Sequence, residues 1–100
     1  MLTKKKALEI PSTLTVTGQG DTIKLKLTYN NLPMDAVQEL LDAEDKTVAD
    51  VVLAVVKEWE SEYELSTEGL NELENDRPGM VVALIQGFYD ARRMTKAKNS

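Results

Sequence analysis

With 100 residues and a formal net charge of −5, the chain is long enough for one domain with a modest hydrophobic core. It contains no histidine and no cysteine, which excludes the commonest general base, a thiol nucleophile, disulfide bonds and the ligands that zinc prefers. The basic N-terminus lacks the apolar run of a signal peptide, and no stretch approaches the ~20 apolar residues of a membrane span. We therefore expect a soluble intracellular protein.

The charges are distributed unevenly. From Asp35 to Asp76, fourteen acids stand against two lysines, a local balance of −12, so the remaining residues sum to +7. An acidic middle would repel phosphates, which argues against nucleic acid as a partner. Solubility and charges at helix ends explain such a pattern. The more specific alternative is that the acidic region binds a cationic segment of a partner.

Two segments near the N-terminus alternate between apolar and polar residues. Ser12–Thr17 and Asp21–Tyr29 both show the period of two that is typical of a half-buried strand. Between them, Gly18-Gln19-Gly20-Asp21 favours a tight turn, because glycine tolerates positive φ. These features predict an antiparallel β-hairpin.

The next pattern has the period of a helix. Leu32–Glu44 begins with a proline suited to a first helical turn, and we expect this amphipathic helix to lie on the hairpin. The acids Asp42, Glu44 and Asp45 follow, but they lack the spacing and the glycine of a calcium loop. We expect a solvated corner there and no metal site.

A central helix is predicted from Thr47 to Trp59, with Asp50 placed to complete a capping box. Its valines give it some strand character, but the cap and the apolar spacing that reaches Trp59 favour helix. Its apolar stripe comprises Val48, Val52, Val55, Val56 and Trp59, widened by Val51 and Leu53.

Two further helices are expected. Ser66 or Thr67 caps a short helix that ends near Asn75, and a last helix runs from about Pro78 to about Met94, with Asp76 able to cap it. Gly87 lies inside this last helix, where glycine costs roughly 1 kcal/mol relative to alanine. We expect the close approach of a neighbouring helix to compensate for that cost.

Together these elements predict an α+β fold, an N-terminal antiparallel β-hairpin followed by about four α-helices packed as a small bundle. We expect a partly ordered basic N-terminus over residues 1–10, a single domain over 11–95 and a disordered tail over 96–100. The predicted core consists of Val52, Val56, Trp59, Leu84, Ile85 and Phe88.

The sequence offers little for catalysis. The acids at positions 58, 60, 62 and 64 fall at a helix end and a loop, where water would keep them unperturbed, and no phosphate loop or nucleophile elbow is present. We expect a protein that is not an enzyme and has no cofactor. The apolar surfaces of the two long helices instead indicate partner binding, and our candidate partner-binding residues are Val51, Val55, Trp59, Leu84, Phe88 and Tyr89.

The order of these features resembles a known family. A valine-rich segment ending in Val56-Lys57-Glu58-Trp59-Glu60 is followed by a capped short helix at Ser66-Thr67-Glu68-Gly69-Leu70. With Leu73, Pro78 and the closing Phe88-Tyr89, the region from about Met34 to Arg93 looks like the small tail assembly chaperones of long-tailed bacteriophages and prophages.

The resemblance implies a non-enzymatic protein of the host bacterial cytoplasm. Its partners would be a phage tape measure protein, which it keeps soluble, and the tail tube protein that later displaces it; a homo-oligomer is also left open. The competing class is a small structural component for tail completion or head–tail joining that remains in the particle, or an antitoxin-like binding module. A nucleic-acid regulator comes third.

Overall fold

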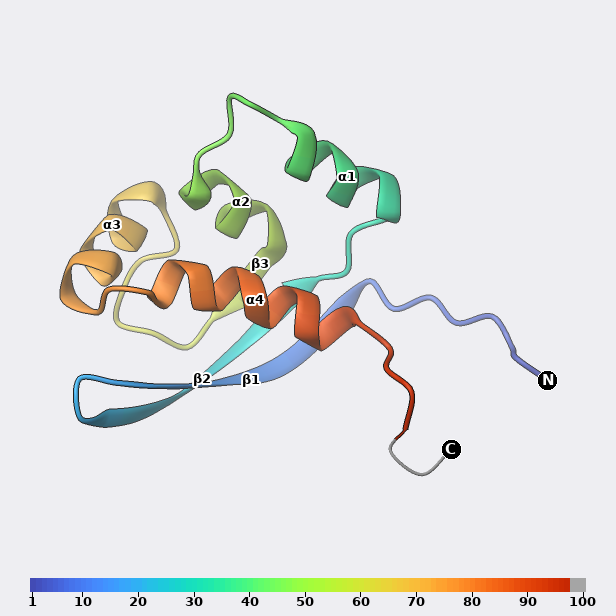
Figure 1. The fold of residues 1–100 in the computed structure, drawn as a ribbon, viewed down its shortest axis with the longest axis horizontal. Coiled ribbons are helices and arrows are strands. Elements are labelled where there is room, and N and C mark those ends of the chain that lie inside the picture. Colours follow the sequence, from blue (N-terminus) through green and yellow to red (C-terminus); the bar gives the residue numbers. More distant parts are fainter. Residues whose placement is uncertain (98–100) are drawn as a thin grey trace.

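The computed structural model describes residues 1–97 and contains a small sheet with four helices on one side of it (Figure 1). This arrangement confirms the predicted α+β fold with its N-terminal hairpin. The predicted tail at 96–100 falls partly on residues 98–100, which lie outside the described residues. In chain order the elements are β1 (Glu9–Gly18), β2 (Asp21–Asn30), α1 (Met34–Asp42), α2 (Val48–Val55), β3 (Val56–Trp59), α3 (Thr67–Asp76) and α4 (Met80–Arg92).

The hairpin forms where the alternation predicted it, with longer strands. Its loop is Gln19-Gly20, and φ is positive at both positions, 54° and 75°, which gives the backbone twist of a two-residue hairpin loop. Leu14 pairs with Leu25, so apolar side chains lie beside one another on the face toward the helices. Thr13, Thr15 and Lys24 are exposed on the opposite face.

The predicted helix from Thr47 to Trp59 is wrong in its last turn. α2 ends at Val55, and residues Val56–Trp59 form β3, which pairs antiparallel with β2 in the order β1-β2-β3. The register shifts between Thr28 and Tyr29, so two residues of β2 span three of β3. Val56 and Trp59 are three residues apart, a spacing that suits one helix face and equally suits one face of a bulged strand.

Side chains cap the starts of α2 and α3. At α2 the capping box is confirmed, because the Thr47 hydroxyl accepts a bond from Asp50 N at 3.1 Å and the Asp50 carboxylate accepts one from Thr47 N at 3.0 Å. At α3 the cap is Ser66, whose hydroxyl accepts from Gly69 N at 3.1 Å.

The start of α4 differs from the prediction. Asp76 belongs to α3, and α4 begins at Met80. The Glu74 carboxylate, on the preceding helix, accepts hydrogen bonds from Gly79 N at 2.8 Å and from Val81 N at 3.1 Å. A carboxylate at this position satisfies free N–H groups and suits the positive end of the helix dipole.

α1 does not lie on the hairpin as expected. It packs through Val37 and Leu40 beside α2 and α4, and none of its side chains is fully buried (Figure 1). The strands on that side are already covered by α4, which lies against β1, and by α2, which packs against α4. Because the inner face of the sheet is occupied, the apolar stripe of α1 packs onto the helices.

The core lies between the sheet and helices α2, α3 and α4. Of the predicted core residues, Val52, Val56, Leu84 and Phe88 are buried, while Trp59 and Ile85 are half-buried against them. The buried side chains are Leu25, Leu27, Tyr29, Val52, Val55, Val56, Leu70, Leu73, Met80, Val81, Leu84 and Phe88.

Gly87 marks a close approach, but its neighbour is the sheet. A Cβ on Gly87 would lie 2.4 Å from the Tyr29 hydroxyl and 2.9 Å from Leu14 Cδ1. The same hydroxyl donates a 2.9 Å hydrogen bond to the carbonyl of Leu84, one turn earlier in α4. Because Gly87 has no Cβ, the hydroxyl of Tyr29 on β2 can reach the backbone of α4.

Candidate functional site

An apolar hollow lies where α1 meets α2 and α4. Its volume is about 220 Å³, and we call it the α1–α2–α4 groove. It is lined by Val37, Leu40 and Leu41 of α1, Val51 and Val55 of α2, and Ile85, Phe88 and Tyr89 of α4. A concave surface lined only by aliphatic and aromatic side chains is suited to binding apolar groups of a partner.

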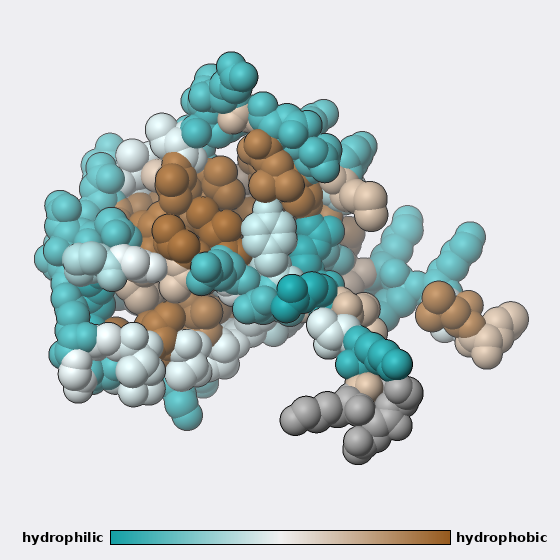
Figure 2. Space-filling model, viewed as in Figure 1, coloured by the Kyte–Doolittle hydropathy of each residue, from teal (hydrophilic) through white to brown (hydrophobic). Residues whose placement is uncertain are grey.

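A second hollow continues the apolar surface toward the start of α2 and α4. Its volume is about 270 Å³, and it is lined by Val48, Ala49, Leu70, Asn71, Glu74, Val81 and Val82. Three side chains of the combined surface are notably accessible: Leu41 is 62% exposed, Val82 52% and Val48 51%. Figure 2 shows apolar side chains gathered between α1, α2 and α4 and bordered by hydrophilic ones. Such a contiguous patch is typical of an interaction surface.

Aromatic contacts hold the floor of the groove. The rings of Phe88 and Tyr89 meet edge to face at 5.3 Å, and Phe88 meets Tyr29 in the same way at 5.9 Å. Arg92 lies over the Phe88 ring at 5.1 Å and donates a 2.7 Å hydrogen bond to the Leu32 carbonyl. The Arg92 hydrogen bond connects α4 to Leu32, two residues before α1, and the Tyr29–Phe88 contact connects α4 to β2.

The structure brings together four of the six residues expected to bind a partner. Val51, Val55, Phe88 and Tyr89 all line the α1–α2–α4 groove. Leu84 is 0% exposed and belongs to the core, as do Val55 and Phe88 at 1% each. Val51 and Tyr89 are therefore the two expected residues that stay partly accessible in the groove, and Trp59 lies on β3, away from it. Whether any of them binds a partner stays a prediction.

Sequence reasoning missed the contribution of α1 to this groove. Val37, Leu40 and Leu41 were expected to cover the hairpin, and Ile85 was expected in the core. The signal was present in the amphipathic pattern of α1, but the pattern gives no information on which neighbour a helix stripe packs against.

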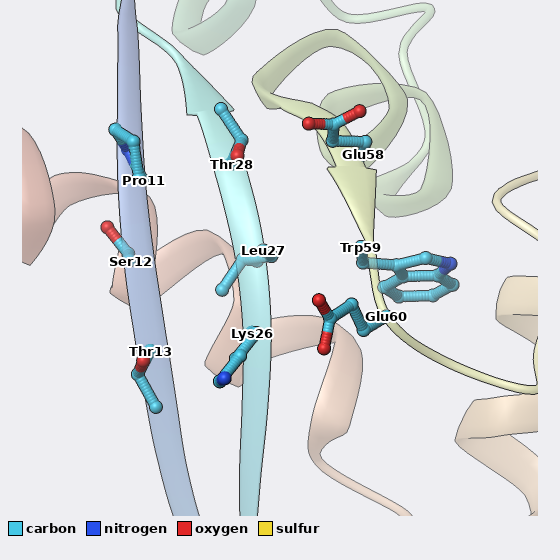
Figure 3. Close-up of a pocket in the computed structure, with 9 residues that line it drawn as sticks. All are labelled: Pro11, Ser12, Thr13, Lys26, Leu27, Thr28, Glu58, Trp59 and Glu60. Atoms are coloured by element: carbon cyan, nitrogen blue, oxygen red, sulfur yellow. The ribbon is translucent and has the colours of Figure 1, made fainter.

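A larger, polar hollow of about 620 Å³ lies along the three strands (Figure 3). Residues 11–13 of β1, 26–28 of β2 and 58–60 at β3 line it, and the Trp59 ring points away from β1 and β2. Glu58 and Glu60 are exposed, as expected for solvated acids. Among the described residues, no group of three or more acids could hold a metal ion.

The pKa shifts of the molecule have structural causes. Burial raises the pKa of Tyr29 to about 12, with Asp90 adding to the effect. A hydrogen bond from the Thr47 backbone lowers the pKa of Asp50 at the α2 cap. The Glu9 carboxylate, which accepts a hydrogen bond from Lys57 across the sheet, raises the pKa of that lysine. None of these groups lines the α1–α2–α4 groove.

In the part of the chain that the structure describes, no helix combines the length and the apolar character that crossing a membrane requires. A family model described as a phage tail assembly chaperone matches residues 9–99. Neither the curated proteins nor the solved structures contain a match to the chain.

Proposed function

The chain belongs to the phage tail assembly chaperone family, and from this premise we propose that it binds apolar helical segments of a phage tape measure protein. Binding would keep the tape measure protein soluble in the host cytoplasm until tail tube proteins displace the chaperone during assembly. The proposed role is non-enzymatic and needs no cofactor. The observation that carries the proposal is the α1–α2–α4 groove with its accessible apolar rim.

The groove suits one face of an amphipathic helix. Apolar side chains three and four residues apart on such a helix lie on one side, and they would enter the hollow between α1 and the α2–α4 pair. Burying the accessible parts of Leu41 in the groove, and of Val48 and Val82 in the adjoining second hollow, would be favourable at about 25 cal/mol per Å² of apolar area removed from water. Several weak sites of this kind along a long partner would keep its apolar surface covered.

Acidic side chains near the groove support the proposal that the chain keeps its partner soluble. Glu39, Asp42, Glu44 and Asp45 are exposed on α1 and in the loop that leads to α2. Their charge would repel neighbouring chaperone–partner complexes and so oppose aggregation. A helix with basic flanks would in addition gain favourable charge contacts at this border.

Co-expression tests the proposal. The tape measure protein encoded by the same phage should be mostly soluble with this chain and mostly insoluble without it. Leu41→Asp places a charge on the rim of the groove and should abolish the rescue. Leu8→Asp is the matched control, because Leu8 is 78% exposed and lies before β1, away from the groove, so rescue should persist.

Circular dichroism of both variants establishes that the fold is intact. If both variants keep the tape measure protein soluble equally well, the groove is not the binding surface. If the unchanged chain does not keep it soluble, the chaperone role is rejected. Purified virions distinguish the alternative function: a tail-completion or head–tail joining component would remain in the particle at stoichiometric levels, whereas a chaperone would be absent.

A further inference from the structure

The two edges of the sheet differ in how they are protected. β3 is one edge, and it is only four residues long, bulged against β2, and charged at Lys57 and Glu58. Short length, bulges and charges are the usual devices that prevent an edge from pairing with another chain. β1 is the other edge, ten residues long, and it has no charged side chain from Ile10 to Gly18.

The hydrogen bonds of the sheet identify which backbone groups of β1 point outward. The Lys26 carbonyl accepts a 2.9 Å hydrogen bond from Glu60 N on the β3 side of β2. The backbone N–H and C=O of Lys26 therefore point away from its β1 partner Thr13, and the two residues form a non-bonded pair. Antiparallel pairs alternate between bonded and non-bonded, so Thr13, Thr15 and Thr17 direct their N–H and C=O groups away from β2. The 2.9 Å bond from Asn31 N to Leu8 O agrees, because it places the even-numbered residues in the bonded pairs.

Space for another strand is present beside this edge. A hollow of about 370 Å³ borders it, lined by Ser12, Thr13 and Leu14 of β1, by Tyr29 of β2, and by Gly87, Asp90 and Ala91 of α4. Because Thr13 lies on the outer face and Leu14 on the inner face, the hollow reaches the strand edge itself. Pro11, which has the same parity as the outward threonines and no N–H, ends the open stretch on one side.

We propose that β1 pairs antiparallel with β1 of a second copy of the chain, joining the two sheets into one. The open stretch Ser12–Gly18 is centred on Thr15, so a two-fold axis there pairs the longest run of residues. Every outward N–H and C=O of Thr13, Thr15 and Thr17 then gains a partner.

The side chains favour a second copy over an unrelated strand. With Thr15 opposite its symmetry mate, Leu14 meets Val16 of the other copy on the inner face, and Thr13 meets Thr17 on the outer face. Each apolar residue therefore faces an apolar one, and no like charges oppose each other. The two-fold axis stands perpendicular to the sheet, so both helical layers lie on the same side. The proposal is independent of the chaperone role, but in such a dimer two α1–α2–α4 grooves would face one long partner.

Sedimentation equilibrium from low to high micromolar concentration tests the pairing. The unchanged chain should shift from monomer to dimer, and the amides of Thr13, Thr15 and Thr17 should exchange with solvent more slowly as the dimer forms. A monomer at every concentration would overturn the proposal, as would a dimer in which these three amides exchange as fast as in the monomer.

Two variants at one position form the matched pair. Thr15 lies beside Lys24, so Thr15→Lys would align four lysines across the dimer, whereas Thr15→Val adds no charge and keeps a β-branched side chain. Thr15→Lys should be monomeric and Thr15→Val should still dimerise. Dimerisation of Thr15→Lys as strong as that of the unchanged chain, or loss of the dimer in Thr15→Val, would overturn the proposal. Thr15→Pro, which removes only an outward N–H and leaves the bonds to β2, should also be monomeric.

Discussion

Replacing Gly87 by alanine tests how closely α4 approaches the sheet. The new Cβ would lie 2.4 Å from the Tyr29 hydroxyl and 2.9 Å from Leu14 Cδ1, so at least one side chain must move. Overpacking of this kind costs about 1–3 kcal/mol, and displacing the hydroxyl from the Leu84 carbonyl costs about 1 kcal/mol more. The higher helix propensity of alanine stabilises the fold by about 1 kcal/mol relative to glycine. The expected net loss of stability is therefore about 2 kcal/mol.

The origin of that loss is measurable in a double-mutant cycle. In a Tyr29→Phe background the hydroxyl is absent, and the nearest remaining ring atom, Cζ, is 3.5 Å from the new Cβ, an ordinary contact. Only the end of the flexible Leu14 side chain must then shift, so Gly87→Ala should cost less than about 1 kcal/mol.

Urea unfolding of the four proteins gives the coupling free energy, provided that the transitions are two-state. Gly18→Ala is the control, because a Cβ at Gly18 meets nothing within 4 Å, and its effect should be small and the same in both backgrounds. Equal costs of Gly87→Ala with tyrosine or phenylalanine at position 29 would refute the reasoning.

Four further predictions rest on the local structure. Because the fold raises the pKa of Tyr29 to about 12, its stabilising effect should be complete below pH ~10 and lost as the pH rises through 12, which absorbance at 295 nm and unfolding curves would detect. Thr47→Ala removes the α2 cap and should cost about 1 kcal/mol in urea unfolding. The pKa of Asp50 is lowered, so NMR titration should find its stabilising contribution present above pH ~4 and lost as the pH falls through the depressed pKa; an ordinary pKa in folded protein would contradict the cap. Gly69→Ala should be more damaging than any other Gly→Ala change, because its Cβ would lie 1.8 Å from the backbone oxygen of Glu64, which only a main-chain shift relieves; a melting temperature near that of the unchanged chain would disprove this.

The candidate site was partly visible in the sequence. The helical spacing of Val51 with Val55 and the adjacent aromatic pair Phe88-Tyr89 placed those residues on apolar helix faces, and all four line one groove. The contribution of α1 was not visible. An amphipathic pattern predicts that the apolar stripe of a helix is covered, but it does not indicate which element covers it. The groove exists only where three separate helices meet.

Local chemistry was sufficient for the hairpin and for the starts of α2 and α3. The alternation of β1 and β2, the glycines of their turn and the Thr47–Asp50 capping box all depend on residues close together in the chain, where backbone geometry and side-chain reach decide the outcome. The family resemblance also rested on such local features, and the family match over residues 9–99 agrees with it.

Tertiary structure decided what local patterns left ambiguous. Val56–Trp59 satisfies a helix stripe and a bulged strand equally well, and the unpaired edge of β2 selects the strand because its backbone groups there gain partners. Gly87 signalled a close approach, but only the packed structure shows that the neighbour is Tyr29 of the sheet. In each case the sequence specified a surface or a small residue, and the contact partner came from a segment distant in the chain.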